Sequence, residues 1–241
     1  MSEILKYSGD IKKCIVMILP YIEKYVADKG TILTICAQPE ICDILMIMFG
    51  GSVNVHKMDP FRSIQDTHTR DVKDFFESYY GFAQSYNFKL TKPLNYDKNK
   101  QLKYKNFVCI FPKRRETDKI HNISSSIFDS ILGVIRKYCP DMEIYIIGNP
   151  LDKLSVKKEK CYDVDRFVDS LDYLKYCKLF ICSESNWVQI AMLCNCRNIV
   201  VYHSPKTAAD MSHNLFNCDL LQIENADDAL LIEKIRNTQY A

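Results

Sequence analysis

Two turns of the chain carry side chains suited to a phosphorylated, hydroxyl-rich ligand. The first turn contains Lys113, Arg114 and Arg115, directly after the apolar run NFVCIF. Guanidinium groups bind phosphate oxygens through paired hydrogen bonds, so this turn predicts a site for a diphosphate. A basic loop that is merely solvated has the same composition, and the residues alone leave that alternative open.

The second turn joins the apolar run KLFICS to a helix-like apolar segment, and it reads Ser183, Glu184, Ser185, Asn186, Trp187. Free N–H groups and a positive dipole end make the start of a helix favourable for an anion. Glu184 could accept hydrogen bonds from two neighbouring hydroxyls of a ribose or a hexose. In the alternative interpretation, Ser183 or Ser185 serves only as a helix N-cap.

Other chemical patterns have weaker support. Asp163-Val164-Asp165 fits the D-x-D pattern that holds a divalent metal, but one such pair is expected by chance and it precedes a helix. The pair Cys194 and Cys196 lacks a second pair at zinc-finger spacing. No Walker A loop, G-x-G-x-x-G or G-x-S-x-G motif is present. We therefore expect no metal site and no cofactor.

The elements that must position these turns follow an α/β rhythm. Continuous apolar strands that alternate with amphipathic helices indicate parallel sheets covered on both faces. A helix over 11–29 is expected to be interrupted or kinked at Pro20 and stopped by Gly30. Residues 1–10 are polar and mixed, and no strand is predicted there. The other predicted strands are 31–37, 52–58, 106–111, 142–148, 178–183 and 198–203, and the other helices are 39–49, 70–80, 124–139, 164–177, 187–195 and 227–237.

The polar stretch TKPLNYDKNKQLKYK (91–105) is the best linker in the chain. It predicts two Rossmann-like halves, residues 1–100 and 101–241, each with a parallel sheet and with a cleft between them. Ligands of open parallel sheets bind beyond the carboxyl ends of the strands. The turns at 113–115 and 183–187 should therefore lie at one edge of the second sheet.

Composition excludes several classes of protein. The chain has 241 residues, 47% of them hydrophobic, and a formal net charge of +2, so no bulk charge points to nucleic acid. The apolar runs 14–22 and 41–49 are far shorter than the roughly 20 residues of a transmembrane helix. Eleven cysteines without an apolar leader favour free thiols and a cytoplasmic location. Abundant Ile, Lys, Asn and Tyr are typical of AT-rich genomes, such as those of protists or large DNA viruses.

Five segments resemble, in order, the donor-binding half of GT-B glycosyltransferases, closest to the heptosyltransferase-like group. They are FVCIFPKRR, YIIGNP, DSLDYLKYCKLF, ICSESNWVQIA and CRNIVVYH, all within residues 106–241. FPKRRETDK also resembles the basic motif of the fucosyltransferases related to this fold, where Arg contacts the donor diphosphate. Within the fourth segment, ICSESNWVQIA, Glu184 stands where that family has Asp, Ser185 where it has Thr, Asn186 where it has Gly, and Gln189 where it has His.

The resemblance implies a transferase that moves a sugar from a nucleotide-diphosphate donor to a hydroxyl of a glycan acceptor. UDP or GDP with a deoxyhexose such as L-rhamnose or L-fucose is the predicted donor. No metal is expected, because Arg, Lys and the helix dipole stabilise the leaving diphosphate. The implied donor-binding residues are Lys113, Arg114, Arg115, Gly148, Ser183, Glu184, Ser185, Asn186 and Trp187.

An inverting transfer needs a base that deprotonates the acceptor hydroxyl, whereas a retaining transfer does not. We predict Asp59 and His68 for this role, and Asp10 and His56 are further candidates. Asp10 would alternatively cap a helix, His56 would pack on its strand, and Asp59-Pro60 would form a turn. The short N-terminal half lacks an obvious first strand with a Gly-rich loop, where the family keeps its catalytic carboxylate. That shortness favours the alternative function, a non-catalytic nucleotide- or sugar-binding module.

Overall fold

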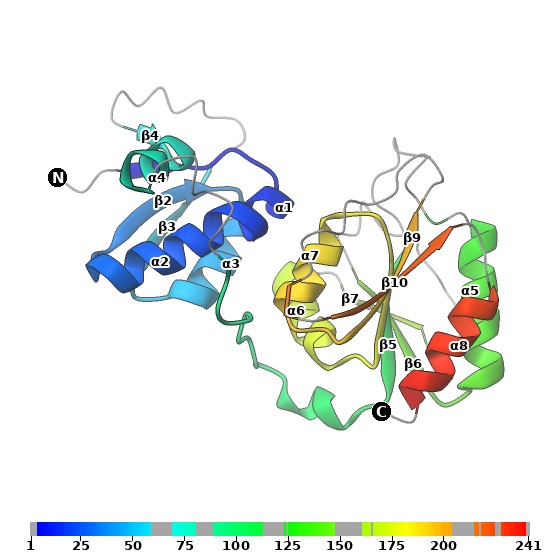
Figure 1. The fold of residues 1–241 in the computed structure, drawn as a ribbon. Coiled ribbons are helices and arrows are strands. Elements are labelled where there is room, and N and C mark those ends of the chain that lie inside the picture. The colour runs from blue at the N-terminus through cyan, green and yellow to red at the C-terminus, as the bar shows by residue number, and fades with distance from the viewer. Residues whose placement is uncertain are drawn as a thin grey trace. The chain divides into compact units, whose positions relative to one another are not determined.

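Each half of the chain folds around its own parallel β-sheet (Figure 1). Contacts in the computed structural model divide the chain into the units Met1–Asn95 and Tyr96–Ala241. The predicted fold class, two Rossmann-like α/β halves with parallel sheets, is confirmed. The structure describes residues 4–58, 69–80, 89–112, 123, 125–147, 161–164, 166–203, 215–216, 218–224 and 228–239.

The first unit has a four-stranded sheet in the order β3-β2-β1-β4, with every pair parallel. The expectation that residues 1–10 form no strand is wrong, because β1 lies between β2 and β4 in this sheet. Only Leu5 of its three residues is buried, so the strand carries almost no apolar signal. The elements are β1 (Ile4–Lys6), α1 (Ile11–Lys13), η1 (Cys14–Ile18), α2 (Leu19–Lys29), β2 (Leu33–Ala37), α3 (Pro39–Phe49), β3 (Val53–Lys57), β4 (Thr69–Asp71) and α4 (Val72–Tyr80).

The first helical stretch runs without a break from Ile11 to Lys29. The predicted interruption at Pro20 is replaced by a π-helical turn, Cys14–Ile18, that precedes the proline. Proline lacks an N–H and crowds the carbonyl one turn back, and the wider π turn accommodates both effects. Gly30 ends the helix as predicted, in the left-handed conformation with φ 60°.

The second unit has a six-stranded parallel sheet in the order β10-β9-β8-β5-β6-β7. Among the described residues, the helices α5, α6, α7 and α8 flank it, and each predicted strand of this unit is present. The sequence did not predict the two edge strands, β7 and β10. The elements are η3 (Lys100–Tyr104), β5 (Phe107–Phe111), α5 (Ser125–Tyr138), β6 (Glu143–Ile147), β7 (Cys161–Val164), α6 (Phe167–Tyr176), β8 (Leu179–Ser183), α7 (Asn186–Leu193), β9 (Asn198–His203), β10 (Asp219–Glu224) and α8 (Asp228–Gln239).

The strand order of the second sheet contains a topological switch point. From β5 the chain proceeds to β6 and β7 on one side, then returns to β8, β9 and β10 on the other. The carboxyl ends of β5 and β8 therefore flank the place where connections diverge, which is where open α/β sheets bind ligands. The first sheet has the same arrangement on a smaller scale, with its switch point between β1 and β4.

Helices cover both faces of the second sheet (Figure 1). On one face α5 and α8 pack over a core of sheet residues that includes Val108, Ile144, Ile181 and Val200. On the other face lie α6 and α7, with α7 in contact with β8 and β9. The eleven cysteines are all free thiols, and nine of them are buried.

The predicted linker is fixed to a different unit at each end. The carboxylate of Glu23 on α2 accepts hydrogen bonds from the backbone N–H and the hydroxyl of Thr91, both at 2.8 Å. The carboxylate of Asp172 on α6 accepts from the backbone N–H groups of Lys98 (3.2 Å) and Asn99 (2.9 Å). Residues 92–97 lie between Thr91 and Lys98, the nearest residues held by these two carboxylates. The boundary between the two units falls within this stretch.

Candidate functional site

The structure places the turn after β8 beside the switch point of the second sheet. Phe111, the last residue of β5, pairs with Cys182 of β8, so the chain segments that follow the two strands leave from neighbouring positions. The backbone N–H of Glu184 donates to the carbonyl of Tyr202 at 3.1 Å, which continues the β8–β9 pairing one residue beyond β8. The turn at 183–187 is thus fixed on a rigid sheet edge.

Three side-chain oxygens around this turn are buried without a hydrogen-bond partner among the described residues. They are Ser183 Oγ, Glu184 Oε2 and Gln189 Oε1. The side chains of Ser183 and Gln189 belong to residues that are 1% and 5% exposed, whereas Glu184 is half-buried. A buried polar atom without a partner costs about 1–3 kcal/mol, so such atoms call for a ligand or another donor.

The start of α7 adds the favourable end of a helix dipole to these oxygens. Ser185 is the N-cap, with an extended backbone, and its Oγ accepts from the N–H of Trp187 at 3.3 Å. Its carbonyl accepts from the N–H of Val188 at 3.2 Å. The N-cap interpretation of Ser185 is therefore confirmed, and Asn186 is the first residue of the helix.

Trp187 has a packing role at the same place. Its ring lies 5.5 Å from that of Phe111 and 5.7 Å from that of Phe167, measured between centroids. These contacts tie the start of α7 to the end of β5 and the start of α6. The half-buried indole therefore stabilises the walls of the site, whatever it contacts in a ligand.

The remaining predicted site residues lie outside the described residues. These are Lys113, Arg114, Arg115 and Gly148 of the donor site and the two predicted bases, Asp59 and His68. Lys113 directly follows Pro112, which itself follows the last residue of β5. Their roles stay predictions.

Two acidic side chains lie near the switch point of the first unit. The sequence predicted only one of them, Asp10, as a candidate. Asp10 lies between β1 and α1 and caps α1, with its carboxylate accepting from the N–H of Lys13 at 2.7 Å. Asp71 ends β4, pairs in register with Lys6, and accepts from the N–H of Lys73 at 2.8 Å. Both carboxylates are exposed.

Tyr7 lies at the same edge, and its hydroxyl donates to the backbone carbonyl of Asp10 at 2.9 Å. Burial raises the pKa of Tyr7, and the negative charges of Asp10 and Asp71 raise it further. The phenol therefore stays protonated and acts as a hydrogen-bond donor. His56, the other candidate described here, is exposed on β3 and does not pack on its strand as its alternative interpretation required.

Asp163 of the D-x-D pattern lies elsewhere. It lines a hollow of about 540 Å³ together with Arg166, Asp169, Asp172 and Lys98, among others. The Arg166 guanidinium in the same hollow forms an ion pair with Asp169 at 3.6 Å. Asp165 lies outside the described residues.

The described part of the chain contains neither a metal-binding cluster nor a membrane-spanning helix. No group of three or more His, Cys, Asp or Glu side chains there could hold a metal ion. No helix in that part combines the length and apolar character that crossing a membrane requires.

Gln189 and Asp71 lie at the two candidate sites, and the sequence did not predict a role for either of them. Gln189 is the one polar side chain in the middle of WVQIAML, and a polar residue on a buried helical stretch is the signal that could have found it. Asp71 follows a three-residue strand that the apolar pattern did not predict. Its position at a strand end became visible only with the sheet order.

Comparisons with known proteins agree with this architecture. No family model and no curated protein sequence matches the chain. Among solved structures, E. coli ADP-heptose lps heptosyltransferase II matches with a TM-score of 0.68 and 9% identity, over 100% of this chain and 99% of that one. E. coli heptosyltransferase WaaC, solved with ADP, matches with a TM-score of 0.66 and 7% identity, over 99% and 100%.

A third similar structure is the glycosyl transferase family 9 protein from Veillonella parvula DSM 2008. It matches with a TM-score of 0.64 and 7% identity, over 97% of this chain and 88% of that chain. At these identities the likeness shows the fold, which is GT-B-like, and the heptosyltransferase-like part of the resemblance has structural support. None of the three is a fucosyltransferase, so that part of the resemblance stays a prediction.

Proposed function

We propose that the chain is a glycosyltransferase of the heptosyltransferase type, which transfers a sugar from a nucleotide-diphosphate donor to a hydroxyl of a glycan acceptor. The second unit would bind the donor at the carboxyl ends of β5 and β8. The GT-B-like fold and the heptosyltransferase neighbours support this proposal. Fold likeness alone does not establish an activity, so the argument rests on the site.

One observation carries the proposal: buried oxygens that have no partner among the described residues gather at a topological switch point. Ser183 Oγ, Glu184 Oε2 and Gln189 Oε1 can each accept a hydrogen bond. A ligand with several hydroxyls, such as a ribose or a hexose, supplies donors to such acceptors. The first N–H groups of α7 are hydrogen-bond donors, and together with the helix dipole they favour an anion. A sugar joined to a phosphate satisfies both demands.

The leaving diphosphate would be stabilised by the start of α7 and by the basic turn Lys113, Arg114 and Arg115. Preorganised donors aimed at developing negative charge are a large part of transferase catalysis. Transfer without a metal ion follows from this arrangement and stays part of the proposal. Gly148, after β6, would let the backbone approach the ligand closely.

We propose Asp10 as an additional candidate for the catalytic base, beside the predicted Asp59 and His68. Asp10 lies in the short segment between β1 and α1, and the resembling family keeps its catalytic carboxylate after its first strand. Asp71 lies at the end of the neighbouring strand β4. A carboxylate there would take the proton of the acceptor hydroxyl in an inverting transfer. The protonated phenol of Tyr7 would help to orient the acceptor.

The donor base and sugar are a finer part of the proposal. The similar WaaC structures are described with ADP and with ADP-2-deoxy-2-fluoro heptose, so an ADP-sugar joins UDP and GDP donors as a candidate. A deoxyhexose stays the sequence-based prediction for the sugar. The non-catalytic binding module is less favoured, because the first unit has its own β1–β4 switch point with carboxylates at both strand ends.

A thermal-shift screen with ADP, UDP and GDP tests donor binding directly. A ligand that binds only the folded protein stabilises it by about 2.7 kcal/mol when its concentration is one hundred times its Kd, and the melting temperature therefore rises. We expect one of the three to raise the melting temperature, and the matching nucleoside without phosphate to do so much less. If none of the diphosphates raises it, the donor-site proposal fails.

A further inference from the structure

A basic hollow lies at the amino-terminal edge of the second sheet, the edge opposite the candidate donor site. Its volume is about 480 Å³. The residues before β5 and before β8 form most of it, because those two strands are neighbours and begin side by side. The lining residues are Lys103, Tyr104, Lys105, Asn106, Lys178 and Thr238.

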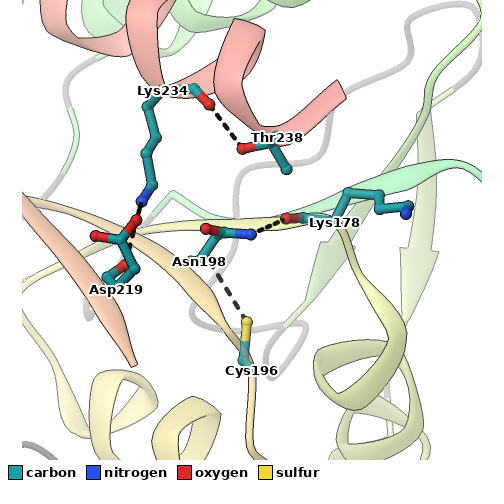
Figure 2. A network of polar contacts seen from close by, with 6 residues as sticks. All are labelled: Lys178, Cys196, Asn198, Asp219, Lys234 and Thr238. Carbon is teal, nitrogen blue, oxygen red and sulfur yellow. Dashed lines mark hydrogen bonds and ion pairs between the residues drawn. The ribbon is translucent and has the colours of Figure 1, made fainter. Parts of the chain in front are cut away.

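The ammonium groups around this edge differ in how far they are already neutralised. Lys234 is buried and forms an ion pair with Asp219 (Figure 2), so its charge is used within the fold. Lys105 shares its charge with Glu143 at 3.2 Å and also donates to Tyr145. Lys103 and Lys178 form no ion pair with the described carboxylates.

Lys178 is held by its backbone while its side chain remains available. Its N–H donates to the carbonyl of Phe107 at 2.9 Å, and its carbonyl accepts from the amide of Asn198 at 3.1 Å. Figure 2 shows its side chain extending away from Asn198 and out of the network. The backbone of Lys178 is therefore fixed at the start of β8, and its ammonium group lies on an exposed side chain.

The other wall of the hollow is also ordered. The hydroxyl of Thr238 donates to the carbonyl of Lys234, which ties the last turn of α8 to the Lys234–Asp219 pair (Figure 2). Opposite, Tyr104 is 80% exposed, and the ammonium of Lys103 lies 4.6 Å from the centre of its ring. This cation–π contact holds the Lys103 ammonium and the exposed ring together at the rim of the hollow.

We propose that this hollow binds a small ligand that carries phosphate groups, at a site separate from the donor site. Lys103 and Lys178 would contact the phosphate oxygens from two sides, since ammonium groups bind phosphate as point charges. Asn106 adds a neutral hydrogen-bonding group. The concave shape favours a small anion over an extended polyanion such as nucleic acid.

A purely structural role for these lysines predicts something different. Cations near helix C-termini offset the negative dipole end, and both α6 and α8 end at this edge of the sheet. In that case removal of Lys103 and Lys178 would lower the melting temperature and leave anion binding unchanged.

Calorimetric titration with inorganic pyrophosphate at low ionic strength separates the two roles. The double variant Lys103→Gln/Lys178→Gln should bind pyrophosphate about tenfold more weakly, which is the loss expected for two exposed ion pairs. The double variant Lys89→Gln/Lys92→Gln makes the same charge change at two exposed positions of the first unit and should leave binding unchanged. Equal affinity of the double variant and the parent protein overturns the proposal.

Two further arms identify the source of the phosphate. Glu184→Gln changes the candidate donor site, so pyrophosphate binding that responds to Glu184→Gln but not to the lysine variants overturns the separate site and leaves the donor site standing. Sedimentation with vesicles of phosphatidylcholine, with and without phosphatidylserine, tests lipid headgroups. Lysine-dependent binding to the anionic vesicles without any binding of pyrophosphate overturns the small-ligand proposal in favour of a membrane surface.

Discussion

The backbone N–H of Glu184 donates to the carbonyl of Tyr202 at 3.1 Å, one residue beyond the end of β8. This bond fixes the turn to the neighbouring strand β9 before α7 begins. Glu184 then holds a carboxylate oxygen, Oε2, that is buried without a partner among the described residues. A fixed backbone beneath an unsatisfied carboxylate is typical of a binding site rather than of a helix cap.

The first prediction concerns Glu184→Gln. Glu184 is half-buried, and its Oε2 has no partner among the residues that the structure describes, so loss of the charge should leave the melting temperature unchanged or slightly higher. Donor binding should weaken about tenfold, which corresponds to roughly 1.4 kcal/mol. Calorimetry with the diphosphate chosen by the screen measures both quantities against Glu233→Gln, an exposed control on α8. A lower melting temperature with intact donor binding would return Glu184 to a capping role.

The second prediction concerns Gln189→Met, which keeps the length of the side chain and removes its amide. Because Gln189 Oε1 is buried without a partner in the described part of the chain, the variant should unfold at the same or a higher urea concentration. Ligand affinity should nevertheless fall, since one acceptor is lost from the site. Destabilisation by more than about 1 kcal/mol would mean that the amide is satisfied within the fold.

The third prediction concerns Asp10→Asn. Asparagine caps helices about as well as aspartate, so the variant should keep its melting temperature. If Asp10 is the base, turnover should fall by about 10²–10⁴-fold while donor affinity stays the same. Asp74→Asn is the control, because Asp74 is exposed in the first turn of α4 and is not part of the proposed site. Equal turnover of Asp10→Asn and the parent protein would leave Asp59 and His68 as the candidates.

The fourth prediction concerns the anchor of the linker, Asp172, which is 3% exposed. Burial raises the pKa of its carboxyl, although hydrogen bonds from Asn99 and Lys98 lower it in part. The folded state then holds the proton more tightly than the unfolded state, where the pKa is about 3.9. Its contribution to stability is therefore fully present below that value and falls as the pH rises through the folded pKa.

Asp172→Asn removes this titration and replaces one acceptor oxygen by a donor, which should cost about 1–3 kcal/mol. The difference in unfolding free energy between the parent protein and the variant should shrink as the pH rises from about 3 to about 6. Trp187 is the single tryptophan of the chain and lies in the second unit, so its fluorescence reports this unfolding. A difference that grows over the same range would contradict the raised pKa.

Strong apolar runs made most of the fold predictable. The predicted strands at 31–37, 106–111 and 178–183 correspond to β2, β5 and β8, each buried along its whole length. The missed strands are short or lie at sheet edges, where one side meets solvent and polar residues interrupt the pattern. Tyr162 and Asp163, for example, are both exposed on the edge strand β7, and β10 begins with Asp219.

The candidate site was predictable only as far as sheet topology could be inferred. The rule that ligands bind at the carboxyl ends of parallel strands placed the turn at 183–187 correctly at such an edge. It gave no information on burial, which is what distinguishes Ser183 and Gln189 from capping residues. Asp71 could not be found, because its role depends on β4 pairing with β1 across about sixty residues of sequence.

The central claim is that the turn after β8 binds the donor of a glycosyl transfer. Release of the nucleoside diphosphate from ADP-, UDP- and GDP-sugars, with and without a glycan acceptor, tests it most directly. The account predicts release from at least one donor by the parent protein, about tenfold slower release by Glu184→Gln, and an unchanged rate for Glu233→Gln. No release from any of the donors, or equal rates for Glu184→Gln and the parent protein, would contradict it.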